Sequence, residues 1–181
     1  MKVKEFSYKI VLTGATAVGK TSLVNKYVTN QFQLNYIPTL GVNVMIKDLE
    51  INGTTVQLLI WDVGGQDKWA RVRNMYYRGS RAAIAVYDTT DPQSLEKIPK
   101  LVDEYDAAIK ETKKYETALI LLGNKIDLSS NRKVDIKQGE EMKDKIKASH
   151  FYETSAKTGE NVEDAFMQVA KELLTKERIK D

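Results

Sequence analysis

The sequence contains no cysteine, which excludes disulfides, thiolate metal sites and catalytic thiols in this chain. The same absence excludes prenylation and palmitoylation of these residues, and Lys2 excludes N-terminal myristoylation. No apolar run approaches the roughly 20 residues that span a bilayer. The first residues, MKVKEFSYKIV, also lack the apolar core and the cleavage site of a signal peptide. We therefore expect a cytoplasmic protein without a membrane anchor in this chain.

An excess of one charge is missing as well. The net charge is +3, and the 28 Lys and Arg residues are scattered rather than gathered in an arm. Because a nucleic-acid-binding protein usually shows a denser basic patch, we expect no nucleic acid partner. The composition, 42% hydrophobic and 29% charged over 181 residues, is typical of one globular domain that covers residues 1–181.

Apolar segments of strand length alternate with segments of helical period. The expected strands are Tyr8–Thr13, Val42–Ile51, Thr55–Trp61, Ala82–Asp88, Ala118–Gly123 and His150–Thr154. The expected helices are Lys20–Val28, Leu95–Ile109, Asp135–Ile146 and Val162–Leu174. This alternation predicts a doubly wound α/β fold with a six-stranded, mostly parallel sheet. The pair Asn52–Gly53 between two strand-like runs predicts a hairpin, which makes one edge strand antiparallel.

The segment GATAVGKT, residues 14–21, matches the phosphate-loop pattern G-x-x-x-x-G-K-[ST]. It follows the apolar run YKIVLT and precedes the helix-like TSLVNKYV, which is the context that the pattern requires. Backbone N–H groups of such a loop surround phosphates, and the helix N-terminus adds a favourable dipole. We expect Lys20 to reach the β- and γ-phosphates and the Thr21 hydroxyl to hold Mg²⁺. The loop alone leaves ATPases, kinases and GTPases as alternatives.

The segment GNKIDL follows the fifth expected strand and could read the base. The Asp127 carboxylate could accept hydrogen bonds from N1–H and the exocyclic amine of guanine, whereas adenine presents an acceptor at N1. Ligands of such sheets bind at the carboxyl ends of strands, which favours this role over that of a simple turn. In ETSAKTG, residues 153–159, the segment Ser155–Lys157 could bind the guanine carbonyl oxygen, cap the last helix, or do both.

Two further segments could serve a metal ion and the γ-phosphate. Asp62 ends the third strand, where its carboxylate could hold the Mg²⁺ shell through water. Thr39 lies in the irregular segment NQFQLNYIPTLGV and could complete the Mg²⁺ octahedron when γ-phosphate is present. The segment WDVGGQDKW, residues 61–69, has two glycines and a glutamine after an apolar run. Taken alone it is typical of a strand-ending turn.

Together, GATAVGKT, the Thr39 segment, WDVGGQ, NKID and ETSAK resemble the guanine-nucleotide motifs of the Ras superfamily of small GTPases. The order and the spacing are those of the family, and the resemblance covers nearly the whole chain. PTLGV, LLIWD, YYRGS, AVYDTTD and ETSAKTGENVEDAF are similar to Rab proteins. WDVGGQDKW instead resembles Arf proteins, because the Rab pattern has Thr-Ala before Gly-Gln.

The resemblance implies a P-loop (Ras-like) fold and a molecular switch that binds GTP or GDP with Mg²⁺ and hydrolyses GTP slowly. The implied catalytic residues are Gln66, which positions the attacking water, Lys20 and Thr39. The implied nucleotide-binding residues are Gly14, Ala15, Thr16, Ala17, Val18, Gly19, Lys20, Thr21, Ser22, Phe32, Tyr36, Thr39, Gly65, Asn124, Lys125, Asp127, Ser155, Ala156 and Lys157. The implied Mg²⁺ ligands are Thr21, Thr39 and Asp62.

The resemblance also implies partners: effectors, exchange factors and GTPase-activating proteins that bind residues 30–46 and 62–79. It implies a monomer that is cytoplasmic, peripheral to a membrane through partners, and active in membrane trafficking. The chain departs from relatives at Thr16 and Ala17, which are glycine in Ras itself, and at Val44, where many Rabs have an aromatic residue. A binding module that barely hydrolyses GTP and a small-molecule kinase are the alternatives; NKID and ETSAK disfavour the kinase.

Overall fold

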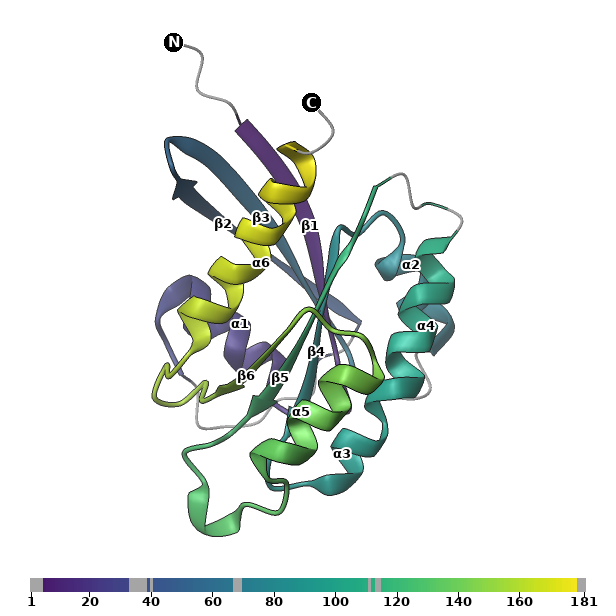
Figure 1. The fold of residues 1–181 in the computed structure, drawn as a ribbon, viewed down its shortest axis with the longest axis vertical. Helices are drawn as coiled ribbons and strands as arrows, with labels where there is room; N and C mark the ends of the chain where they lie inside the picture. The colour runs from purple at the N-terminus through teal and green to yellow at the C-terminus, as the bar shows by residue number, and fades with distance from the viewer. Residues whose placement is uncertain are drawn as a thin grey trace.

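The computed structural model describes residues 5–32, 39, 41–66, 70–110, 112 and 115–178. Its strands are β1 Glu5–Thr13, β2 Val42–Ile51, β3 Thr54–Val63, β4 Ala82–Asp88, β5 Ala118–Asn124 and β6 His150–Thr154. They form one six-stranded sheet in the order β2-β3-β1-β4-β5-β6 (Figure 1). The β2–β3 pair is antiparallel and the other neighbours are parallel. The predicted doubly wound sheet with one antiparallel edge is confirmed.

The hairpin between β2 and β3 fixes the register of the antiparallel edge. Asn52 and Gly53 have φ angles of 51° and 74°, the left-handed values that a two-residue hairpin turn favours. The turn pairs Ile51 with Thr54, and the ladder continues to Val42 opposite Val63. The start of β2 therefore lies beside the end of β3, which brings the chain before β2 next to the residues that follow β3.

Six α-helices flank the sheet in the described part of the chain (Figure 1). They are α1 Lys20–Thr29, α2 Ala70–Tyr77, α3 Pro92–Glu96, α4 Ile98–Lys110, α5 Ile136–Lys145 and α6 Val162–Arg178, with a 3₁₀ turn at Ser129–Asn131. Among the described residues, no helix combines the length and the apolarity needed to cross a membrane.

The prediction of a single helix over residues 95–109 is wrong, because two helices cover this stretch. Asp91 caps α3 by accepting a hydrogen bond from the Gln93 N–H, and Pro92 occupies the first turn, where proline is tolerated. Helix α2 was not expected at all. Two of its inward positions are Arg73 and Tyr77, both buried, and an arginine on the inner face breaks the apolar period that pattern analysis detects.

Alternation along the strands divides the core between the two faces of the sheet. On β1, Ile10 and Leu12 face the side covered by α1 and α6, whereas Val11 faces the side of α2 and α4. Tyr27 of α1 stacks on Phe166 of α6 with ring centroids 4.2 Å apart. Because both faces are covered, β4 is buried throughout. The carboxyl ends of the parallel strands all lie at one edge of this packed sheet.

Candidate functional site

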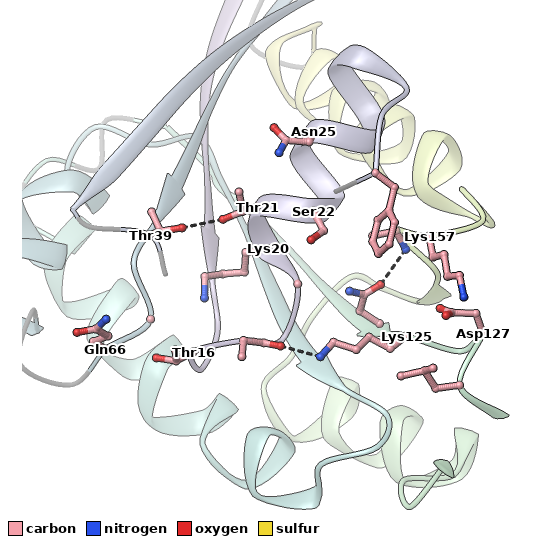
Figure 2. Close-up of a pocket in the computed structure, with 17 residues that line it drawn as sticks. Thr16, Lys20, Thr21, Ser22, Asn25, Thr39, Gln66, Lys125, Asp127 and Lys157 are labelled. Carbon is pink, nitrogen blue, oxygen red and sulfur yellow. Dashed lines mark hydrogen bonds between the residues drawn. The ribbon is translucent and has the colours of Figure 1, made fainter. Parts of the chain in front are cut away.

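A cavity of about 380 Å³ lies at the carboxyl edge of the sheet. Most of its lining had been predicted from the motifs: Thr16, Ala17, Gly19, Lys20, Thr21, Ser22, Phe32, Thr39, Gly65, Gln66, Asn124, Lys125, Asp127, Ala156 and Lys157. Figure 2 shows Gln66 and Thr16 toward one end of the cavity and Asp127 and Lys157 toward the other. Segments that are far apart in the sequence thus form a single elongated site.

Five predicted residues lie behind this lining and support it. Gly14, Ala15 and Val18 contribute main-chain carbonyl oxygens. Those of Gly14 and Ala15 accept hydrogen bonds from Lys20 Nζ, and that of Val18 accepts one from Asn124 Nδ2. The other two are Asp62, which accepts from Thr21, and Ser155, which donates to Asp127. The remaining predicted residue, Tyr36, lies outside the described residues.

Two residues of the lining were missed by the sequence analysis. Asn25 lies three residues after Ser22 and four after Thr21, so that the helical period places all three on one face of α1. Leu128 follows Asp127 directly and remains exposed. The period of α1 was a usable signal for Asn25, whereas the sequence offers no comparable signal for Leu128.

The phosphate-loop end of the cavity holds a buried positive charge. Lys20 is 6% exposed, and its Nζ lies 2.8 Å from the Gly14 carbonyl oxygen and 2.9 Å from that of Ala15. Burial lowers the pKa of Lys20 to about 8; the negative charge of Asp62 opposes this shift, and Arg73 adds to it. A bound anion would stabilise the ammonium and raise this pKa again. The loop is therefore suited to phosphate.

The N-terminus of α1 supports the same conclusion. Its N-cap residue is Gly19, which has no side chain to accept a hydrogen bond from the first turn. The N–H groups of that turn have no partner within the helix, and the helix dipole favours negative charge at this end. Phosphate oxygens are ligands that such a helix start accepts.

Three hard oxygen atoms meet beside Lys20. The Thr21 and Thr39 hydroxyl oxygens are 2.7 Å apart and point toward one another (Figure 2). Thr21 donates to Asp62 Oδ2, and Thr39 lies 3.5 Å from the same oxygen. Asp62 is 1% exposed. Burial raises its pKa, while the hydrogen bond from Thr21 and the charge of Lys20 lower it.

This arrangement fits Mg²⁺, which prefers oxygen ligands and usually binds one or two carboxylates together with substrate phosphates. Asp62 Oδ1 is buried and has no hydrogen-bond partner among the described residues. A cluster of three or more His, Cys, Asp or Glu side chains is likewise absent from that part of the chain. A metal here would thus need further oxygens from a ligand, which the adjacent phosphate loop can hold.

Toward the other end of the cavity, Asn124, the last residue of β5, joins the phosphate loop to the end of β6 and the segment after it. It is 0% exposed, and its Nδ2 donates to the Val18 carbonyl oxygen at 2.9 Å. Its Oδ1 accepts from the Thr154 hydroxyl and from the Ala156 N–H, both at 3.2 Å. The amide is therefore used as both donor and acceptor, and it ties the phosphate loop to the segment after β6.

Asp127 and Lys125 are held in distinct ways. Asp127 Oδ1 accepts from the Ser155 hydroxyl at 2.6 Å, which fixes the carboxylate at the edge of the cavity. Lys125 Nζ donates to the Ala17 carbonyl oxygen at 2.7 Å and pairs with Asp88 Oδ2 at 2.7 Å. The side chain of Lys125 is thus a second link between the phosphate loop and the loop after β5.

The structure leaves no room for a side chain at either glycine of WDVGGQ, Gly64 or Gly65. A Cβ atom at Gly64 would lie 2.8 Å from the Thr39 carbonyl oxygen, and one at Gly65 would lie 2.6 Å from the Gly14 carbonyl oxygen. The Gly64 N–H also donates to the Gly41 carbonyl oxygen at 2.9 Å. The alanine that the Rab pattern has at position 64 would not fit this contact. A simple strand-ending turn does not account for such packing against two other loops.

Comparison with known proteins agrees with the motifs. The Ras family sequence model matches residues 9–175. Ras-related protein Rab-21 of Mus musculus is 38% identical over 171 residues, which cover 94% of this chain and 75% of that protein. Ras-related protein Rab-13 of Rattus norvegicus is 36% identical over 175 residues, which cover 97% of this chain and 84% of that protein. The predicted resemblance to Rab-like members of the superfamily is confirmed.

We predict that Gly64→Ala destabilises the protein by about 1–3 kcal/mol, the usual cost of overpacking. The added methyl group would collide with the main-chain oxygen of Thr39 at 2.8 Å and lie tightly against that of Gly41 at 3.2 Å. Main-chain oxygens cannot rotate away as a side chain could. Urea denaturation of the two proteins without nucleotide measures the difference. A free energy of unfolding within about 0.5 kcal/mol of wild type, the range of neutral surface changes, would contradict the close contact.

Proposed function

Because this chain belongs to the Ras family of GTPases, we propose that residues 1–181 form one G domain that acts as a Rab-like, GTP-dependent switch in membrane trafficking. It binds GTP or GDP with Mg²⁺ and hydrolyses GTP slowly. The observation that carries the proposal is the single cavity in which Lys20 lies toward one end and Asp127 toward the other. This arrangement suits a ligand with phosphates at one end and a guanine base at the other.

The phosphates bind residues 14–21 in this proposal, with the Lys20 ammonium on the β- and γ-phosphates. Its burial supports this role, since a buried charge is costly until it is paired. At the base end, Asp127 accepts the two guanine hydrogen bonds, and the Ala156 region meets the guanine carbonyl oxygen. Phe32, half-buried in the lining, packs against the base.

Thr21, Thr39 and Asp62 would hold Mg²⁺. When bound, the ion neutralises negative charge on the β- and γ-phosphate oxygens. Asp62 supplies the carboxylate, and the two hydroxyls reorient from one another toward the ion. Thr39 precedes β2, and Gly65 follows β3. In this proposal, both residues contact the γ-phosphate and transmit its presence to the chain around them.

Gln66 lines the same cavity and is assigned to orient the attacking water. Its side-chain amide can accept one proton of the water and donate toward a phosphate oxygen. Thr16 lies toward the same end of the cavity (Figure 2). The nucleotide-binding motifs contain no arginine, so we propose a low intrinsic rate of hydrolysis and acceleration by a partner.

We propose residues 30–46 and 62–79 as the surface for effectors, exchange factors and activating proteins. The exposed Val44 and Ile46 of β2 belong to this surface. Tyr76 of α2 belongs to it as well, and it packs against Trp61, just outside these ranges, with ring centroids 6.1 Å apart. We propose that the protein acts as a monomer, is cytoplasmic, and reaches membranes through these partners.

Guanine selectivity is tested by Asp127→Asn. Loss of the carboxylate removes two hydrogen bonds to the base and should weaken GDP binding by about 3 kcal/mol, or roughly 10²-fold. Xanthine nucleotides, which present a carbonyl oxygen where guanine has its amine, should bind better than in wild type. Titration with fluorescent GDP and XDP measures both affinities.

Ser155→Ala is the matched control, because it removes the 2.6 Å hydrogen bond to Asp127 but keeps the carboxylate. This variant should still prefer guanine to xanthine. Unchanged GDP affinity in Asp127→Asn would rule out the assigned role of Asp127.

Hydrolysis is tested by Gln66→Leu, which keeps the volume of the side chain and removes its hydrogen-bonding groups. We expect GTP affinity near that of wild type and single-turnover hydrolysis slowed at least about tenfold, a low value for loss of a group that positions a proton transfer. Gln57→Leu makes the same chemical change on β3, where Gln57 binds Asp48, and should leave the rate unchanged. Equal, measurable rates in wild type and Gln66→Leu would exclude a hydrolytic role for Gln66.

A further inference from the structure

Arg73 is a fully buried arginine on α2 that the proposed roles do not use. It is 2% exposed, and it heads the largest fully buried side chains by volume. Burying a guanidinium is costly unless it is paired and hydrogen-bonded. Two described contacts satisfy the Nη1 and Nη2 atoms and lead to different parts of the fold, whereas the buried Nε has no hydrogen-bond partner among the described residues.

The first contact joins Arg73 to the loop of Gln66. Arg73 Nη1 donates to the main-chain carbonyl oxygen of Gln66 at 2.8 Å. Among the described residues, no other hydrogen bond to Gln66 is present. The main chain of the residue assigned to orient water is thus held by this arginine.

The second contact joins Arg73 to α4. Arg73 Nη2 pairs with Glu104 Oε2 at 2.8 Å, and the Glu104 side chain is 20% exposed. Helix α4 is fixed in the core by Tyr105, which is 1% exposed and packs edge-on against Tyr77 with ring centroids 5.6 Å apart. The planar guanidinium can hold a carbonyl and a carboxylate together in fixed geometry, which a lysine ammonium does less well.

We propose that Arg73, held in place by Glu104, is a positioning residue for GTP hydrolysis. By fixing the Gln66 carbonyl to α4, it keeps the Gln66 side-chain amide directed toward the attacking water. The proposal rests on the proposed function, because it assumes the role given to Gln66. It predicts that the Arg73–Glu104 pair affects the hydrolysis step and acts through Gln66.

The same pair could instead serve only to fasten α2 to α4. In that case its loss would lower stability, and any effect on hydrolysis would be the same whether or not Gln66 is present. A double-mutant cycle between Glu104 and Gln66 separates the two roles, because it measures the coupling of the two side chains directly. Glu104→Gln is the better variant for this cycle, since Glu104 is partly exposed and the change conserves shape.

The experiment measures single-turnover GTP hydrolysis in wild type, Glu104→Gln, Gln66→Leu and the double variant, together with the GTP dissociation constant of each. We expect Glu104→Gln to slow hydrolysis about tenfold, within the loss of up to about 10²-fold that a misplaced catalytic group can cause. GTP affinity should stay within about twofold. In the Gln66→Leu background, Glu104→Gln should have less than about a twofold effect, as expected for fully coupled residues.

Glu177→Gln is the matched control. It breaks an Arg–Glu pair of the same kind, Arg81 with Glu177 at 2.7 Å, in which the glutamate is 23% exposed. This variant should hydrolyse GTP at the wild-type rate. Arg73→Lys keeps the charge but loses the planar fork, so it should slow hydrolysis as Glu104→Gln does.

Three outcomes would overturn the proposal: an unchanged rate in Glu104→Gln, the same loss in Glu177→Gln, or an equal factor in both Gln66 backgrounds. Failure of the proposed function looks different. Wild type would then fail to hydrolyse GTP, or Gln66→Leu would hydrolyse it as wild type does. A third pattern rejects only the role of Arg73: wild type hydrolyses GTP, Gln66→Leu is slower, and Glu104→Gln has the wild-type rate.

Discussion

The buried amide of Asn124 is the interaction on which the site depends. It donates to the phosphate loop at Val18 and accepts from Thr154 and Ala156 at the end of the sheet. Each of these groups is buried and would be costly to leave unpaired. The loop proposed to bind phosphate and the segments proposed to read the base are therefore positioned by one side chain, so a shift at either end would break hydrogen bonds at the other.

Further contacts connect the segments joined by Asn124 to the end of β3. Lys125 binds the Ala17 carbonyl oxygen and Asp88, which adds a second link across the cavity. Gly64 and Gly65 then let the end of β3 pack against both the Thr39 segment and the phosphate loop. A change of ligand at the phosphate end can thus reach the proposed partner surface through short, direct contacts, which a switch requires.

The sequence predicted the sheet, its hairpin and most of the cavity, because these depend on local patterns. Strand alternation, the Asn52–Gly53 turn and the phosphate loop are each decided by neighbouring residues. Helix α2 was missed because one of its inward residues is Arg73, whose buried position depends on Glu104, 31 positions later. The steric need for Gly64 was equally invisible, since Thr39 and Gly41 approach it only in the folded chain.

The central claim is that Asn124 assembles one nucleotide site from separate loops, and the GDP affinity of Asn124→Ala in the presence of Mg²⁺ tests it most directly. Loss of the amide leaves three buried groups unpaired, so we expect GDP to bind roughly 10²-fold more weakly, or by about 3 kcal/mol. Ser80→Ala removes another buried hydroxyl, which binds the Tyr77 carbonyl oxygen outside the cavity, and should leave GDP affinity unchanged. Wild-type GDP affinity in Asn124→Ala would contradict the account.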